Sequence, residues 1–100
     1  MIARVITFQL HPGKTAAMLE IANNSVVPLM QQQAGCKLIT MLSDNMADKV
    51  LAVGLWESAA DLQANEQSGM FQEQLAKVKH LCAIPPLREM YEVSFRTAPI

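Results

Sequence analysis

Polar and hydrophobic positions alternate along some parts of the chain and follow helical spacing along others. Residues 2–10 alternate loosely and are rich in β-branched and aromatic side chains, which predicts a strand ending at the Pro-Gly turn of residues 11–14. In residues 15–33 apolar side chains recur at helical spacing, but Pro28 lies within the pattern. Because proline lacks a backbone donor, we expect this helix to be kinked or interrupted near residues 23–28.

The middle of the chain predicts two strands and the start of a second helix. Gly35 suits the C-terminal cap of the first helix, and residues 36–43 and 49–57 have the composition of strands joined by a turn. Ser58, with Asp61 three residues later, has the form of a capping box. A second helix is therefore expected directly after the second of these strands.

The last third of the chain predicts a further helical piece and a final strand. A second cap is expected at Ser68, and Phe71 and Val78 fall at helical spacing after it. Two consecutive prolines then end the helix, and residues 87–96 have the composition of a strand. The resulting order, β-α-β-β-α-β, is that of a ferredoxin-like α+β fold, with an antiparallel sheet and both helices on one face.

The strand predicted at 49–57 is apolar on both faces. Its alternating residues form two sets: Leu51, Val53 and Leu55 on one face, and Val50, Ala52, Gly54 and Trp56 on the other. Two helices can cover only one face of a sheet, whereas the second face of an antiparallel sheet is normally polar. The bulky set therefore predicts a homodimer in which a second copy packs sheet against sheet.

The smaller set on this strand predicts a cavity. Ala52 and Gly54 leave room beside the large flat side chain of Trp56, which suits a pocket with an aromatic wall. Two alternatives remain open from the sequence: Gly54 marks a bulge or a close approach of a helix, and Trp56 is an ordinary core residue.

Composition and charge exclude several kinds of partner. The 100 residues are the size of one domain, so we expect a single domain over residues 1–100 with its core in about 2–96. A net charge of −1 with scattered Lys and Arg argues against nucleic acid. No apolar run is long enough to span a bilayer and no signal peptide is recognisable, so we expect a cytoplasmic protein with no membrane partner.

The residue pattern also argues against a bound cofactor. Cys36 and Cys82 lack the CxxC spacing of a redox or zinc site, and we expect both side chains to be buried. The chain has no Gly-rich phosphate loop and no His and acid cluster at metal-ligand spacing. We therefore expect neither a metal nor another cofactor.

Five short fragments carry a family resemblance through their order and spacing. They are "HPGK" at 11–14, "AGC" at 34–36, "LWES" at 55–58, the Ser-x-x-Phe of 68–71 and "YEV" at 91–93. Together they resemble the antibiotic biosynthesis monooxygenase family, whose members are small dimeric α+β barrel proteins. The resemblance implies a homodimer with packed sheets and a pocket in each subunit between the sheet and the helices.

The resemblance implies a chemistry for that pocket. Enzymes of the family oxidise quinol-like or polycyclic phenolic substrates with O2 and use no flavin, metal or haem. In one branch a Trp at the end of the third strand lines the site, and Trp56 matches it, where it would stack on the substrate and donate its indole N–H to an oxyanion. Asn65 on the second helix is expected either to contact a substrate oxygen or to serve as a solvated or capping residue. The expected site has two catalytic residues, Trp56 and Asn65, and a substrate-binding set of Ala52, Gly54, Trp56, Leu62, Asn65 and Phe71.

Several positions depart from that enzyme branch and leave two functions open. Its Asn, Tyr and Arg side chains fall here on Ala52 and Leu62 and near Ala76. Haem-degrading relatives place a His at about Leu75, and His80 lies five residues further on, so haem is not expected. The leading hypothesis is a cofactor-independent monooxygenase-like protein acting on a small aromatic or quinone/quinol-type molecule. The alternative is a non-catalytic dimeric module of the same fold, for small-molecule binding or stress response.

Two further side chains have more than one interpretation. Arg4 shares a face of its strand with Ile6 and Phe8, so it is expected either to pair with an acid such as Glu92 or to face the pocket as an anion site. We favour the ion pair. Tyr91 is expected to pack in the core or an interface, with its hydroxyl reaching a polar partner.

Overall fold

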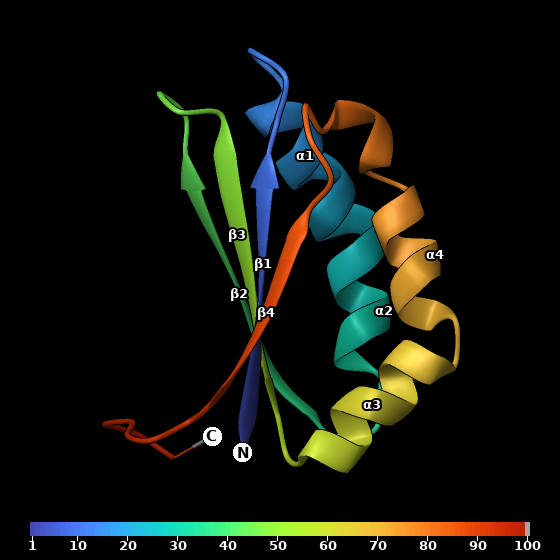
Figure 1. Ribbon diagram of the computed structural model, residues 1–100, viewed down its shortest axis with the longest axis vertical. Helices are drawn as coiled ribbons and strands as arrows, with labels where there is room; N and C mark the ends of the chain where they lie inside the picture. Colours follow the sequence, from blue (N-terminus) through green and yellow to red (C-terminus); the bar gives the residue numbers. More distant parts are fainter. Residues whose placement is uncertain (100) are drawn as a thin grey trace.

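The computed structural model describes residues 1–99 and contains a four-stranded antiparallel sheet whose helices all lie on one face (Figure 1). The strands are β1 (Ile2–Gln9), β2 (Cys36–Asp44), β3 (Lys49–Trp56) and β4 (Leu87–Glu92). Their order across the sheet is β2-β3-β1-β4, so the two strands with the most apolar sequences are central. This arrangement confirms the predicted ferredoxin-like α+β fold.

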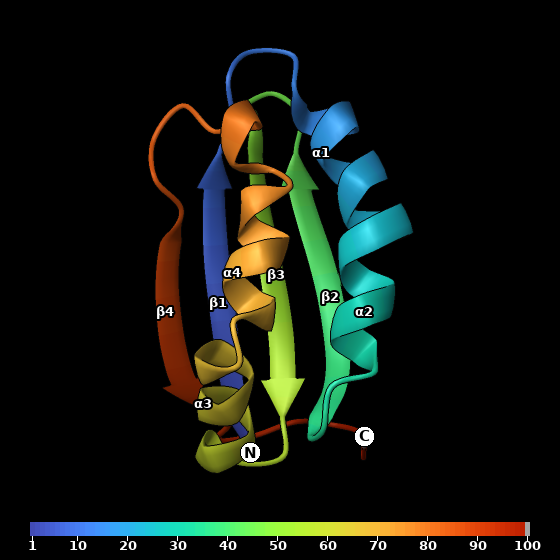
Figure 2. The same cartoon turned by 90° about the vertical axis from the view of Figure 1, so that its right-hand side faces the viewer.

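The helical layer has two runs: one is continuous over residues 15–31 with a π-helical turn in its middle, and the other is divided into shorter pieces (Figure 2). These pieces are α1 (Thr15–Ile21), a π-helical turn η1 (Ala22–Val26), α2 (Val27–Gln31), α3 (Ala59–Gln67), α4 (Met70–Ala76) and a 3₁₀ turn η2 (Lys79–Leu81). The irregularity predicted near residues 23–28 is confirmed as the π-helical turn η1, in which Val27 N donates to the Ala22 carbonyl, and Pro28 follows it in the first turn of α2. None of the helices in residues 1–99 is long and apolar enough to cross a membrane.

The capping box predicted after β3 is confirmed, but two other predicted helix ends are wrong. Ser58 Oγ accepts a hydrogen bond from Asp61 N at 3.1 Å at the start of α3. Gly35 does not cap the first helix, which ends four residues earlier; its φ of +82° places the chain so that a Cβ would collide with the side chain of Asp61. Gly69, with a φ of +87°, is the N-cap of α4, one residue later than predicted, although Ser68 Oγ accepts a hydrogen bond from Met70 N at 3.3 Å while it donates to the Asn65 carbonyl at 2.7 Å.

Two further predicted boundaries differ from the structure near the C-terminus. The helix expected to continue past residue 78 ends at Ala76, and η2 follows it after a short turn. The final strand ends at Glu92 rather than near residue 96, because Val93 N makes the last backbone hydrogen bond of this segment, to the Met1 carbonyl at 3.0 Å. Residues 93–99 have no strand partner, since β1 begins at Ile2.

Register between the strands decides which residues face the helices. Arg4 of β1 lies opposite Gly54 of β3, and Ile6 lies opposite Ala52. Side chains of paired residues point to the same face of a sheet, so this set lies under the helices, and the alternate set points away from them. We call the face without helices the open face.

The open face is apolar and exposed. Leu38, Leu42 and Tyr91 lie on it and are 43%, 50% and 51% exposed. Figure 1 shows no helix on this side of the sheet. Of the two positions expected for Tyr91, the core is wrong, because the register of β4 with β1 turns its ring to this face. Its hydroxyl reaches a polar partner as expected, donating to Glu89 Oε2 at 2.8 Å.

Candidate functional site

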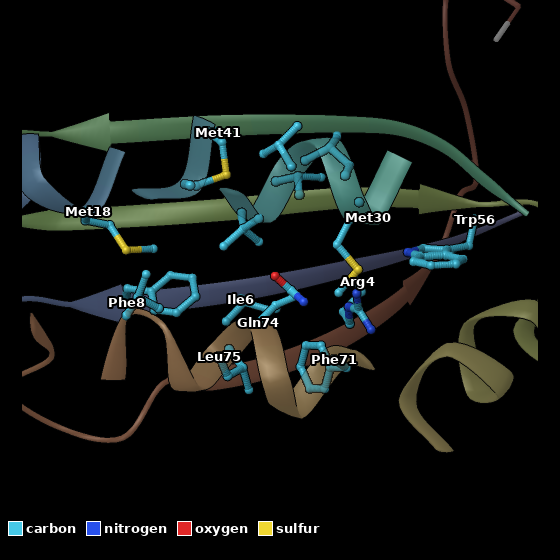
Figure 3. A pocket seen from close by; sticks show the side chains of 18 residues that line it. Arg4, Ile6, Phe8, Met18, Met30, Met41, Trp56, Phe71, Gln74 and Leu75 are labelled. Carbon is cyan, nitrogen blue, oxygen red and sulfur yellow. The ribbon is translucent and has the colours of Figure 1, made fainter. Parts of the chain in front are cut away.

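A cavity of about 70 Å³ lies between the sheet and the helical layer (Figure 3). Its wall is almost entirely apolar, and the three methionines Met18, Met30 and Met41 line it together with Phe71. The volume is about half that of the ~150 Å³ engineered cavity that holds benzene, so a ligand larger than one ring requires side chains to move. Methionine is unbranched and adapts its shape easily, which makes that movement inexpensive.

The β3 strand supplies the floor of the cavity through its small residues. Ala52, Gly54 and Trp56 line it, and Trp56 is 1% exposed. A Cβ at Gly54 would lie 3.1 Å from Trp56 Nε1, tighter than most contacts of real Cβ atoms. Glycine therefore lets the indole lie close over the strand, and the close approach left open by the sequence is made by the indole rather than by a helix.

Two buried polar atoms on the cavity wall have no hydrogen-bond partner within the described residues: Trp56 Nε1 and Gln74 Oε1. Both side chains are at least nine-tenths buried and both line the cavity. Buried polar atoms are rarely left unsatisfied, because each costs about 1–3 kcal/mol. One is a donor and the other an acceptor, so a ligand can satisfy both.

Arg4 brings a positive charge to the same end of the cavity. Its guanidinium carbon lies 5.3 Å from the centroid of the Trp56 ring and 4.2 Å from that of Phe71. Nη1 donates to Asn65 Oδ1 at 3.2 Å and to Glu66 Oε2 at 3.3 Å. Burial lowers the pKa of Arg4 and the Glu66 carboxylate opposes that change, so the guanidinium remains charged.

Glu66 is shared between two arginines. Its Oε2 contacts Arg4, and its Oε1 accepts a hydrogen bond from Arg88 of β4. Two cations and one carboxylate leave this group with an excess of positive charge, which suits an anion at the Arg4 end of the cavity. The prediction that Arg4 pairs with an acid is confirmed, but Glu92 was the wrong partner, because α3 carries Glu66 across the sheet to it.

The structure separates the predicted site residues into two groups. Ala52, Gly54, Trp56 and Phe71 line the cavity. Leu62 and Asn65 are buried but are not among its lining residues. Asn65 is neither solvated nor a cap, since Oδ1 accepts from Arg4 and Nδ2 donates to the Met30 sulfur at 3.7 Å. Its position is that of a side chain that holds the guanidinium in place.

Gln74 and the methionines were missed by reasoning from the sequence. Gln74 falls between Phe71 and Val78 at helical spacing, and all three line the cavity. A polar residue within an apolar helical stripe was therefore the signal that could have identified it. Nothing in the sequence pattern placed the methionines of separate elements around one space.

The cavity has groups for binding and polarising a ligand but few for proton transfer. The polar groups of its described lining residues are the Arg4 guanidinium, the Trp56 indole N–H and the Gln74 amide. Within residues 1–99, no three His, Cys, Asp or Glu side chains come together as metal ligands.

Cys36 and Cys82 are half-buried rather than buried as expected, and burial raises the pKa of both thiols.

The fold and the cavity together define a small α+β protein with a largely apolar site between sheet and helices that is positively charged at one end. The model of the antibiotic biosynthesis monooxygenase family matches residues 1–77. The chain therefore belongs to that family, as its sequence fragments indicated.

Solved structures share the fold over nearly their whole length. A variant of SnoaB, a cofactor-independent oxygenase from Streptomyces nogalater, is 16% identical with a TM-score of 0.79, covering 99% of this chain and 97% of that one. A protein of unknown function from Nitrosomonas europaea is 20% identical with a TM-score of 0.81, covering 99% and 94%. Rv0793 from Mycobacterium tuberculosis is 14% identical with a TM-score of 0.77, covering 97% and 98%. No curated protein matches the chain significantly. At these identities the structural likeness concerns the fold alone.

Proposed function

We propose that this protein is a cofactor-independent monooxygenase-like protein that acts on a small aromatic phenol of the quinol type. The observation that carries the proposal is the indole N–H of Trp56, buried without a partner beside Arg4 in an apolar cavity. A phenolate oxygen matches that position, since it accepts the N–H bond and compensates the arginine charge. The ring of the ligand then occupies the methionine-lined part of the cavity.

The reaction needs no group beyond the phenolate and O2. Arg4 and the Trp56 N–H stabilise the anion and so lower the pKa of the bound phenol. An electron-rich phenolate passes an electron to O2, and oxygen then bonds to a ring carbon that carries hydrogen. The C–H becomes a quinone carbonyl, the second oxygen atom leaves as water, and the phenol supplies all four electrons. The protein contributes desolvation and orientation.

A second function is favoured by one feature of the cavity. No carboxylate, imidazole, thiol or hydroxyl group is among its described lining residues, so nothing there acts as a general base. A non-catalytic binding or stress-response module would use the same cavity without turnover. The leaving proton in the oxygenase proposal must therefore pass to solvent as the phenol binds.

We also propose that the protein is a homodimer formed through the open face. Exposed leucines and Tyr91 on this face form an apolar surface of the kind that usually marks an interface. A partner on this face would leave the cavity untouched, because the cavity lies on the other side of the sheet. Location in the cytoplasm stays a prediction from the sequence.

Oxygen uptake by metal-stripped protein tests the oxygenase proposal. Mono- and polycyclic phenols are supplied with isotopically labelled O2, and the quinone is analysed by mass spectrometry. We expect one labelled atom in each quinone and little peroxide. Trp56→Phe keeps a ring but removes the N–H, and should lower phenol affinity roughly tenfold. Gln72→Ala, at an exposed position of α4, is the control and should change neither affinity nor oxygen uptake. Phenol binding without oxygen uptake above the buffer rate would contradict the oxygenase and support the binding module.

A further inference from the structure

We infer that Gln74 makes the cavity selective for aromatic ligands that carry a second, protonated hydroxyl group. The inference rests on the proposed function, because it assumes that a phenol binds with one oxygen at Trp56 and Arg4. It adds the residue that recognises the second oxygen of a quinol-type ring: Gln74 Oε1 accepts a hydrogen bond from that hydroxyl, while the first oxygen is bound as an anion or carbonyl. A phenol with one oxygen would leave part of the site unsatisfied.

The orientation of the Gln74 amide is set by its neighbour Met70. Nε2 donates to the Met70 sulfur at 3.1 Å, one turn earlier on α4. A thioether accepts hydrogen bonds and cannot donate them, so the NH2 group must face the sulfur. The carbonyl oxygen Oε1 is then left on the other side, where it is buried without a partner. Figure 3 shows the side chain reaching from α4 into the cavity toward the sheet.

No donor on the cavity wall forms a hydrogen bond with this oxygen. Of the other polar lining groups, the Arg4 Nη1 hydrogen bonds go to Asn65 and Glu66. The Trp56 N–H is itself unpartnered and so does not reach Oε1. The remaining lining side chains are hydrocarbon or thioether groups. Oε1 is therefore left free to accept from whatever occupies the cavity, and a ligand hydroxyl is such a donor.

Selectivity follows from the cost of leaving Oε1 unpaired. A site built to bond a hydroxyl rejects an analogue that lacks it, because the buried acceptor then loses its partner. At the usual cost of an unsatisfied buried carbonyl, the expected preference is roughly 10- to 100-fold in affinity. Size alone does not produce such a preference when the two ligands have the same shape.

Anaerobic calorimetry with three matched ligand pairs tests the inference. Catechol, resorcinol and hydroquinone are each compared with the fluorophenol of the same substitution, since fluorine resembles hydroxyl in size and cannot donate. The wild-type protein should bind at least one dihydroxybenzene roughly 10- to 100-fold more tightly than its fluorophenol. In Gln74→Met, which keeps length but removes the acceptor, the ratio should fall to about one.

Each outcome bears on one claim. A ratio near one in the wild type would overturn the inference, as would absence of binding, and as would a ratio that Gln74→Met leaves unchanged. The wild-type ratio alone keeps the inference testable if the variant does not fold. Gln72→Met, at an exposed position of α4, is the matched control and should retain the wild-type ratio. A preserved preference without oxygen uptake would contradict only the oxygenase, whereas uptake without preference would contradict only the role of Gln74.

Discussion

The two faces of the sheet leave different kinds of groups unsatisfied, and β3 contributes to both. On the helix-covered face, the hydrocarbon is shielded from water by the helices, and the unsatisfied groups are polar: Trp56 Nε1 and Gln74 Oε1. On the open face, polar groups are few, and the unsatisfied surface is apolar, with Leu38 and Leu42 about half exposed. The two polar atoms need only one acceptor and one donor, which a small ligand in the cavity can supply.

The exposed apolar surface of the open face, in contrast, can be covered only by another large surface. Burying apolar surface lowers the free energy in proportion to the area removed from water, at about 25 cal/mol per Å². This gain does not depend on the direction of individual contacts. A flat partner, such as a second sheet, meets that requirement, whereas a small molecule does not. The comparison teaches that one strand can serve recognition on one face and assembly on the other, because side chains alternate.

A charge introduced on the open face should have the largest effect, which is on the dissociation constant of the proposed dimer. Leu51→Glu places a charge at the centre of the proposed interface, between Thr7 and Leu42 in the register. An unpaired charge buried there should raise the dimer dissociation constant by about two to three orders of magnitude. Sedimentation of Leu51→Glu measures this, with the exposed helix variant Ala60→Glu as control. A wild-type protein that is monomeric at micromolar concentration would contradict the dimer.

Removing the Glu66 charge should lower the stability of the protein but raise its affinity for phenolates. Glu66→Gln leaves Arg4 without its carboxylate, so the free energy of unfolding should fall by about 1–3 kcal/mol. The remaining positive charge should bind phenolates more tightly, by roughly threefold to tenfold. Urea denaturation and calorimetry measure the two effects. Glu89→Gln makes the same change on the open face and should alter the free energy of unfolding and the phenolate affinity very little. Equal effects of the two variants would argue against a special role for Glu66.

The contact between Gly54 and Trp56 can be tested by a double-mutant cycle. Gly54→Ala adds a Cβ that would lie 3.1 Å from Trp56 Nε1. The substitution should lower the free energy of unfolding by about 1 kcal/mol. In a Trp56→Phe background the contacted atom is absent, so the same substitution should cost much less. Thermal unfolding of the four proteins gives the coupling energy. A coupling energy near zero would show that the glycine serves another purpose.

The smallest expected effect is on pH dependence. Burial raises the pKa of the Cys36 and Cys82 thiols above the unfolded value, so the folded chain binds protons that the unfolded chain releases. This contribution to stability is complete below about pH 8.5 and decreases as the pH rises through the folded value. The double variant Cys36→Ser with Cys82→Ser should flatten that decrease by a few tenths of a kcal/mol. Tyr91, whose pKa is raised by its hydrogen bond to Glu89, should still titrate, and a slope unchanged in the double variant would assign it to Tyr91.

Local patterns in the sequence were enough to predict the order of the elements and the cavity-facing side of β3. Alternation of period two decides that Ala52, Gly54 and Trp56 share a face wherever the strand lies. Capping at Ser58 is equally local, since it joins residues three apart. Helix ends near Gly35 and Ser68 were predicted less well, because close approach to Asp61 and a bond to the Asn65 carbonyl competed with the usual caps.

By itself, the sequence determined the fold class, the kinked first helix and the two unlike faces of the sheet, because these depend on periodicity and on the conformational limits of proline and glycine. Only the tertiary structure decided that Arg4 pairs with Glu66, that Asn65 supports Arg4 rather than lining the cavity, and that Gln74 faces the cavity. The physical reason is distance along the chain. Arg4 and its partners are 61 and 62 residues apart, and their contact depends on where α3 crosses the sheet, which no local pattern encodes.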